Sequence, residues 1–226
     1  MYDLSTSSLF QKYYEIICNR FGNNKPLFSF LDYKQVLNEA CIATNINIDE
    51  NNIDKVAEHF WHVVGSRIYR HEPLEWLSQA GYNLALYGNG WEKHPTLAKH
   101  ARGWINNGEE LCKLFNASKI NLCVHQIGNY SSRVFDGIAS GGFFLMRYHP
   151  ADYEEGGLGK YLDMENDIII FHSRDDLLKK IDYYLKNPDK RKLFTAPVQN
   201  KIIRQYTYKN KMKEVLDIVS KRIASL

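Results

Sequence analysis

A run of polar side chains recurs at helical spacing within residues 128–148, "GNYSSRVFDGIASGGFFLMRY". Four residues at positions i, i+3, i+4 and i+7 share one face of a helix expected over 132–140: Arg133, Asp136, Gly137 and Ser140. The apolar residues of the same helix can face a core: Val134, Phe135, Ile138 and Ala139. A short helix between two expected strands therefore keeps one face that is not apolar.

The start of this helix has the residue types of an anion site. Ser131 or Ser132 can cap it, and the free backbone N–H groups and dipole of a helix N-terminus attract negative charge. Arg133 adds a cation to an end that is already positive, which a bound phosphate group would explain. Asp136, about one turn later, is well placed to accept hydrogen bonds from ribose hydroxyls. The pattern indicates a site for a phosphorylated nucleoside.

Two other interpretations of this helix stay open. Arg133 and Asp136 stand at i and i+3, so they could form an ordinary surface ion pair. Gly137 costs a helix about 1 kcal/mol relative to alanine, and either a ligand or a strand that approaches closely would explain it.

A second stretch with chemical meaning is "YGNGWEKHP", directly after an expected strand. Gly88 and Gly90 can bring the backbone close to a ligand, or they can simply form a glycine-rich turn. The stretch is a partial dinucleotide fingerprint in which His94 stands where the third glycine belongs, so it favours NAD binding only weakly. Trp91 and Trp104 follow strand-end loops, where they could belong to the core or stack on a base.

The elements that must position these residues change in character along the chain. Residues 1–72 are expected to be helical, with apolar stripes through Phe10, Tyr13 and Ile17, through Val36, Leu37 and Ala40 after Asp32, and through Val56, Phe60 and Val64. From residue 73 on, short strands and helices alternate. Strands are expected over 82–88, 120–126, 143–148 and 167–171, and helices over 72–79, 108–118, 132–140 and 174–187 and from Lys190 to the end. Ser173, with Asp176 three residues on, resembles a capping box.

This order predicts an α/β chain in two parts: a helical N-terminal segment, 1–72, and a Rossmann-like domain, 73–226. Short apolar strands separated by helices are typical of a parallel sheet covered on both faces. Ligands of such sheets bind outside the carboxyl ends of the strands, where both stretches described above lie.

Composition excludes several classes of protein. The net charge of +3, from 29 basic and 26 acidic residues, is far from a nucleic-acid signature. The four cysteines form no CxxC pair, and the eight histidines show no metal-ligand spacing, so neither disulfides nor a metal is expected. There is no signal-peptide pattern and no apolar run long enough to span a membrane, which predicts a cytoplasmic location.

Five blocks occur in the order found in the C-terminal domain of GT-B glycosyltransferases: "LALYGNGW", "RGWI", "ELCKLFNASKINLCV", "SSRVFDGIASGGFFL" and "HSRDDLLKKIDYYLKNPDKRKL". The resemblance covers roughly residues 74–215 and is strongest to the branch named for a spore-maturation protein. It implies one half of a GT-B fold that binds a nucleotide-diphosphate sugar, without cofactor or metal, and transfers the sugar to an unknown acceptor.

The resemblance also assigns candidate donor-binding residues. Those from the first loop are Gly88, Asn89, Gly90 and Trp91, and those that border the base are Gly103 and Trp104. Asn129, Ser132 and Arg133 would hold the diphosphate. Asp136 stands where the family has a glutamate that binds ribose, and it is one methylene shorter.

This chain departs from the family in two ways. Retaining members often carry a second glutamate eight residues before the ribose-binding one, where this chain has Gly128. GT-B enzymes also have two Rossmann domains, with the acceptor site on the N-terminal one, whereas residues 1–72 are expected to be helical. Catalytic residues are therefore not assigned, and His94 is a weak candidate for a base.

Three hypotheses follow. The first is the donor-binding part of a nucleotide-sugar glycosyltransferase, possible as a fragment of a longer enzyme or with a partner chain that supplies the missing half. The second is a nucleotide-binding or scaffolding module without activity of its own. The third, an NAD-dependent oxidoreductase, is disfavoured by His94 and by the lack of an acidic residue at the end of a second strand.

Overall fold

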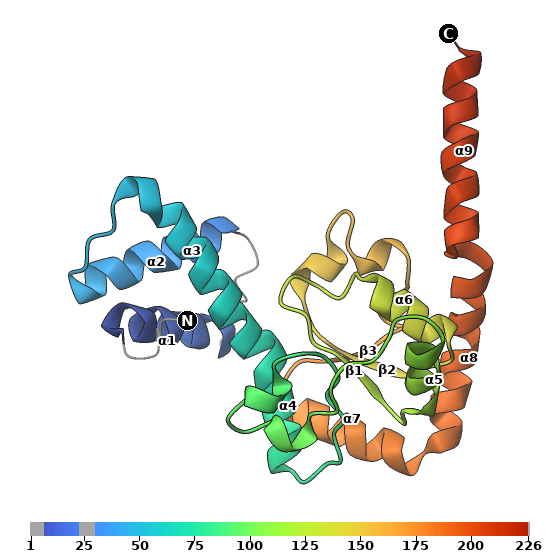
Figure 1. Cartoon of the computed structure of the whole chain (residues 1–226), viewed down its shortest axis with the longest axis horizontal. Helices are drawn as coiled ribbons and strands as arrows, with labels where there is room; N and C mark the ends of the chain where they lie inside the picture. The colour runs from blue at the N-terminus through green and yellow to red at the C-terminus, as the bar shows by residue number, and fades with distance from the viewer. Residues whose placement is uncertain (1–6, 23–29, 226) are drawn as a thin grey trace. The chain divides into compact units, whose positions relative to one another are not determined.

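The computed structural model describes residues 7–22 and 30–225, which belong to two compact units (Figure 1). The first unit takes in the chain up to Leu84 together with Val124–Asn129 and Arg147–Tyr161. The second takes in Ala85–Cys123, Tyr130–Met146 and the residues from Leu162 on. These units are sets of residues in contact, so whether 73–226 folds by itself, as the sequence suggests, stays a prediction.

The first unit begins with three helices, as expected: α1 (Ser8–Gly22), α2 (Phe30–Thr44) and α3 (Glu50–Gly65). The predicted stripes form its core, in which Tyr13, Val36, Leu37 and Phe60 are buried. The rings of Phe10 and Tyr13 both meet Phe60 edge to face, with centroids 5.3 and 5.0 Å away. The sequence suggests that the second helix starts at Asp32, whereas α2 begins two residues earlier, at Phe30.

Helix α3 continues through a π-helical turn into α4. The turn covers Ser66–His71, and α4 covers Glu72–Gln79, which confirms the predicted range. Gly81 follows with a φ of 83°, a left-handed conformation that suits glycine at a helix end. A π turn inside a helix changes which carbonyls are free, and here the carbonyl of Ile68 accepts a hydrogen bond from Arg147.

A three-stranded sheet forms the centre of the second unit, in the order β1-β2-β3. The strands are β1 (Asn121–Cys123), β2 (Phe144–Arg147) and β3 (Ile169–Phe171). β1 and β2 are parallel, with Asn121 opposite Phe144. The strands expected around positions 120–126, 143–148 and 167–171 are confirmed, each shorter than predicted.

The strand expected over 82–88 is wrong. Only Leu86 pairs there, in a single parallel bridge with Ala101. Leu86 is buried, but none of the side chains at 82–85 is, so little apolar surface drives that stretch onto a sheet. Beyond Leu86, the positive φ angles of Gly88 and Gly90 turn the chain away from an extended course.

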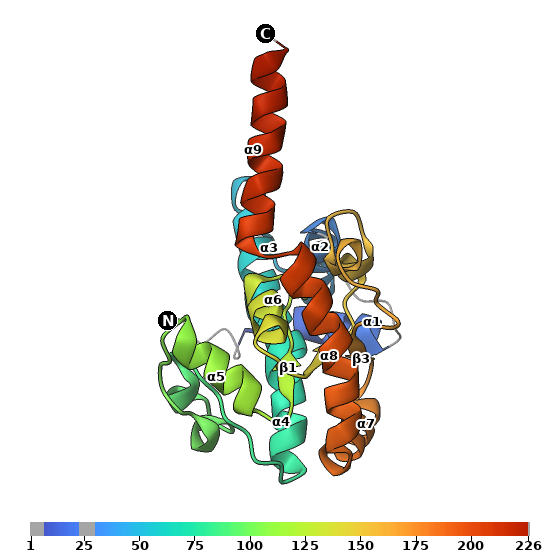
Figure 2. The same ribbon diagram turned by 90° about the vertical axis from the view of Figure 1, so that its right-hand side faces the viewer.

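Helices lie on both sides of the sheet, with α5 (Glu109–Ala117) on one side and α7 (Arg174–Lys186) and α8 (Pro188–Gln205) on the other (Figure 2). α6 (Ser132–Ala139) packs against α5 and α8. A parallel pair of strands covered by helices is a Rossmann-like α/β arrangement, which confirms the expected fold class.

The C-terminal helical region is divided in two. The side chain of Ser173 caps α7 by accepting from the backbone N–H of Asp176 at 3.2 Å. In a capping box the Asp176 carboxylate would accept from the N–H of Ser173, but here it accepts from the N–H of His172. α9 (Tyr208–Ala224) follows α8 and has no buried residue (Figure 1). Among the helices that the structure describes, none has the length and apolar character needed to cross a membrane.

Candidate functional site

The structure brings together two of the predicted loops, the one at Gly88 and the one at Gly103. The N–H of Gly88 donates to the carbonyl of Gly103 at 2.9 Å, one step beyond the bridge between Leu86 and Ala101. Gly88, Gly90 and Gly103 have φ angles of 116°, 94° and 74°. A side chain would be strained at each of these positions, so the glycines are required by the backbone of the paired loops.

The two tryptophans of these loops have different surroundings. Trp91 is 7% exposed and its ring lies 6.0 Å from that of His94, whereas Trp104 is 66% exposed. Trp91 is therefore a core residue that supports the first loop. Trp104 keeps a free aromatic surface of the kind that stacks on a base.

His94, the weak candidate for a base, serves the local fold. Its Nδ1 lies 3.4 and 3.3 Å from the backbone N–H donors of Thr96 and Leu97. A ring nitrogen that accepts from the backbone is not free to take a proton from a substrate. Asn89, between the two glycines of the first loop, is exposed.

The N-terminus of α6 has the features of an anion site. Ser131 occupies the cap position with extended backbone angles, but its side chain makes no capping hydrogen bond, and its Oγ has no partner among the described residues. The backbone N–H groups of Ser132 and Arg133 also have no acceptor in the described part of the chain. The side chains of Ser132 and Arg133 are exposed.

The surface ion pair that competes with this interpretation does not form. Among the ion pairs of the described residues, none joins Arg133 to Asp136. Partial burial raises the pKa of Asp136, whereas an adjacent guanidinium would lower it. Arg133 is thus not neutralised by the carboxylate that is nearest to it along the helix face.

The other two members of the polar face have structural explanations. A Cβ on Gly137 would lie 2.3 Å from Cζ of Phe144, so the glycine makes room for a ring from β2. Ser140 donates its hydroxyl to the carbonyl of Asp136 at 2.6 Å. Of the two explanations that the sequence left open for Gly137, the close approach of a strand is confirmed.

Asn129 lies in the first unit, where it is 1% exposed and held by Asp152. Its backbone N–H and its side-chain amide donate to the two carboxylate oxygens of Asp152 at 2.6 and 2.5 Å. The amide also donates to the carbonyl of Arg147 at 2.8 Å, while its Oδ1 has no partner among the described residues. Both amide hydrogens are therefore engaged in the fold, and an additional role in binding phosphate stays a prediction.

Gly128, where retaining relatives often have a glutamate, has a φ of 103°. A Cβ there would lie 3.2 Å from Oδ1 of Asp152. A carboxylate side chain at this position would be strained and would approach another carboxylate. The departure from the family pattern is thus part of how this loop is built.

Sequence reasoning missed the residues that anchor this loop. His149 is buried, with its Nε2 3.1 Å from the carbonyl of Gln126 and its Nδ1 accepting from the N–H of Ala151 at 3.2 Å. Burial lowers the pKa of His149 and raises that of Asp152, and the hydrogen bonds from Asn129 partly oppose the latter effect. The only signal in the sequence was that polar residues follow the strand "FFLMRY" directly.

Arg147 joins the end of β2 to the π turn. It is 3% exposed, donates to the carbonyl of Ile68 and lies 5.3 Å from the ring centroids of both Tyr69 and Trp76. Burial lowers the pKa of Arg147 to about 10, opposed by the charge of Glu72. This buried cation is a structural part of the first unit.

The described residues contain no group of three or more histidine, cysteine or acidic side chains that could hold a metal ion. Comparison with curated proteins and with solved structures gave no match. A family model described as glycosyl transferase-like matches residues 70–217. The matched span contains both loops, α6 and the whole sheet, while the narrower resemblance to the spore-maturation branch stays a prediction. The chain belongs to the glycosyl transferase-like family.

Proposed function

We propose that this chain is the donor-binding part of a glycosyltransferase that uses a nucleotide-diphosphate sugar. The observation that carries the proposal is the first turn of α6. There the N–H groups of Ser132 and Arg133 have no acceptor among residues 7–22 and 30–225, and the guanidinium is not paired with Asp136. The free N–H groups of a helix N-terminus favour an anion, and an arginine in the same turn adds positive charge that can stabilise a diphosphate leaving group. The family assignment supplies the reaction class, a glycosyl transfer.

The remaining predicted residues take roles around that anion. Asp136 is exposed one turn further on and can accept from ribose hydroxyls, and Trp104 offers an aromatic face to the base. The glycines at 88, 90 and 103 let the paired loops take the left-handed conformations that support Asn89 and Trp104. We keep the expectations that no metal takes part and that the protein is cytoplasmic.

Calorimetric titration with UDP, GDP, dTDP and NAD tests the proposal. One nucleoside diphosphate is expected to bind, and Arg133→Ala to weaken it by roughly tenfold or more, the value of one charge-assisted hydrogen bond. Arg174→Ala is the matched control, because Arg174 is also an exposed arginine in the first turn of a helix. Asp136→Ala should weaken binding of the nucleotide but not of inorganic pyrophosphate.

Equal binding by the Arg133→Ala chain and the Arg174→Ala chain would contradict the assignment of the site. Binding of NAD, with no binding of the nucleoside diphosphates, would contradict the proposal that the ligand is a nucleoside diphosphate.

A second candidate function is nucleotide binding without transfer, alone or with a partner chain that supplies an acceptor domain. It is favoured by the first seventy residues, where positions 7–22 and 30–72 contain helices and no strand. Release of nucleotide from the matching nucleotide sugar separates the two candidates, since only a transferase accelerates it. An active chain would exclude the second candidate.

A further inference from the structure

Helix α9 has an apolar face that nothing in the described structure covers. Six apolar residues, each 47–78% exposed, form this apolar stripe: Tyr208, Met212, Val215, Leu216, Val219 and Ile223. Their separations of three and four residues place them on one side of the helix, over an arc of about 100°. A stripe of this kind normally packs against another surface.

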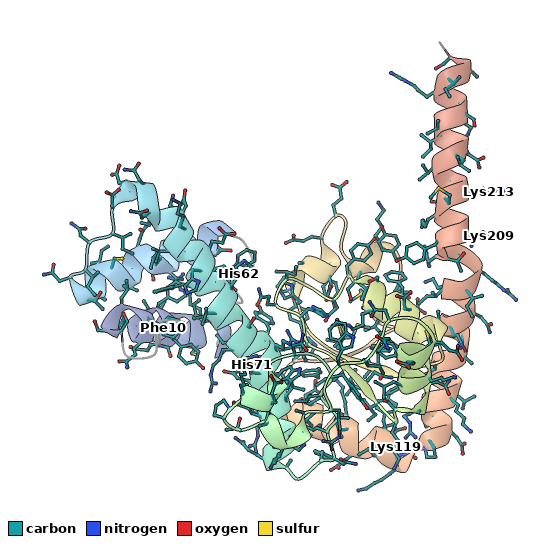
Figure 3. All side chains as sticks on the ribbon, in the orientation of Figure 1. Phe10, His62, His71, Lys119, Lys209 and Lys213 are labelled. Atoms are coloured by element: carbon teal, nitrogen blue, oxygen red, sulfur yellow. The ribbon has the colours of Figure 1, made fainter. Side chains whose placement is uncertain are left out.

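Basic residues border both edges of the apolar stripe. Helical geometry places Lys209 and Lys213 along one edge, one turn apart (Figure 3), and Lys211 and Arg222 along the other. The two acidic residues, Glu214 and Asp217, lie farther from the stripe than the basic residues at its edges. Glu214 pairs with Lys211 at 2.9 Å, which partly offsets the charge of that edge, where Arg222 also lies. Basic side chains therefore border the stripe on both sides, and the edge with Lys209 and Lys213 is the more positive one.

Helix α9 as a whole carries a net positive charge. Tyr208–Ala224 contains five lysines and arginines and two acidic residues, a net charge of +3. The complete chain of 226 residues also has a net charge of +3, so all other residues together sum to zero. Helix α8 is also basic, with five lysines and arginines and one acidic residue, a net charge of +4. α9 differs from α8 in having no buried residue, so its basic residues border an apolar stripe that is exposed.

We propose that α9 binds an anionic phospholipid surface. The helix lies in the plane of the interface, with the apolar stripe at the boundary of the acyl chains and the flanking lysines among the phosphate and carboxylate headgroups. Apolar area and electrostatic attraction together determine the strength of such binding. Each lysine or arginine near an anionic leaflet adds to the attraction.

The same charges argue against a second copy of the chain as the occupant. Two helices that pair through an apolar seam need opposite charges along its edges. Here both edges are basic, so a pair of α9 helices would bring like charges together in either orientation. An anionic surface attracts the basic residues on both edges of the apolar stripe at the same time.

Cosedimentation of the full chain with phospholipid vesicles tests this proposal. We expect binding to vesicles of mixed phosphatidylserine and phosphatidylcholine, weak binding to phosphatidylcholine alone, and a decrease as salt is added. Leu216→Glu should lower the partition coefficient by at least roughly tenfold, because a charge enters the acyl boundary. Ile218→Glu is the matched control, since Ile218 is 67% exposed and lies outside the apolar stripe.

A second pair of variants tests the charges. Lys209→Gln combined with Lys213→Gln should lower binding by roughly tenfold or more. Lys190→Gln combined with Lys192→Gln removes the same charge from exposed positions of α8 and should change it much less. All the substituted side chains are exposed, and an unchanged circular dichroism spectrum shows that each variant folds.

Several outcomes would overturn the proposal: no binding to phosphatidylserine vesicles, equal binding to both kinds of vesicle, or equal loss in a variant and its control. A dimer in sedimentation velocity that Leu216→Glu dissociates would identify a second copy as the occupant instead. Nucleotide titration of the Leu216→Glu chain should match the unaltered chain, so this test is independent of the proposed donor site.

Discussion

At the scale of single residues, one helix face turns out to combine two kinds of residue with different purposes. Arg133 and Asp136 are exposed and not paired with each other, whereas Gly137 and Ser140 serve packing and the helix end. Helical spacing places all four on one face but cannot distinguish these purposes. The distinction depends on Phe144, which comes from the next strand.

Gly137→Ala is expected to destabilise the protein although alanine is the better helix former. The new methyl group would overlap the Phe144 ring, and overpacking of a core costs about 1–3 kcal/mol, more than the gain of about 1 kcal/mol in helix propensity. Urea unfolding should show a lower midpoint. Adding Phe144→Leu should restore part of the loss, and a Gly137→Ala chain as stable as the unaltered one would contradict this account.

At the scale of elements, the loop before α6 is held by groups from the segment after β2. Asp152 accepts from both donors of Asn129, and His149 bridges the carbonyl of Gln126 and the N–H of Ala151. His149 must be neutral for this, because a proton on Nδ1 would remove the acceptor that Ala151 uses. The geometry of the loop is therefore linked to the protonation of one buried ring.

We expect a fall in pH to destabilise the folded chain, because protonation of His149 disrupts the hydrogen bonds that hold the loop before α6. Burial and the nearby charge of Arg147 lower the pKa of the folded imidazole below its usual 6.5, so the unfolded chain binds the proton first. The contribution of neutral His149 to the free energy of unfolding is thus fully present above pH 6.5. It is lost as the pH falls, by at most about 1.4 kcal/mol per pH unit. Urea unfolding between about pH 8 and pH 5 measures it.

His149→Gln is the control for this effect, because glutamine can donate to Gln126 but does not titrate. The difference in stability between the two chains should shrink as the pH falls. The raised pKa of Asp152 has the opposite effect, because it makes the folded chain bind a proton more readily as the pH falls. Asp152 is present in both chains, so its effect cancels from the comparison. A difference in the free energy of unfolding that is constant with pH would show that His149 has the same pKa in the folded and the unfolded chain.

At the scale of the whole molecule, α9 is separate from the packed part of the chain. None of its residues is buried, while Tyr206, just before it, contacts the ring of Phe135 at 6.1 Å between centroids. The first turn of α9 contacts the end of α8, where the side chain of Asn210 donates to the carbonyl of Arg204 at 2.5 Å and the Lys211 ammonium lies 5.3 Å from the ring centroid of Tyr206.

A chain that ends at Thr207 should therefore be about as stable as the full chain. Removing exposed residues that make no core contact changes the free energy of unfolding by about 0.5 kcal/mol or less. Urea unfolding checks this, and nucleotide titration should also be unchanged. A large loss of stability would mean that α9 packs on the rest of the protein in solution.

Local interactions are what the sequence by itself could reveal. Helix positions follow from apolar spacing and from end signals that involve only neighbours, such as Ser173 with Asp176 and Gly81 after α4. The alternation of short apolar strands with helices was enough to predict a Rossmann-like domain, and the order of five sequence blocks indicated the glycosyltransferase family. Each helix-end signal involves residues close together in the chain, and each sequence block is continuous, although the order of the blocks extends over residues 74–215.

Tertiary structure decided everything that depends on a distant partner. The stretch 82–88 has the composition of a strand, yet only Leu86 finds a residue to pair with. Trp91 is buried and Trp104 exposed, although both follow glycine-rich loops. Asn129 meets Asp152, Gly137 meets Phe144, and Arg133 stays apart from Asp136. Burial and pairing across the fold are set by which surfaces the chain brings together, and spacing along the sequence does not encode them.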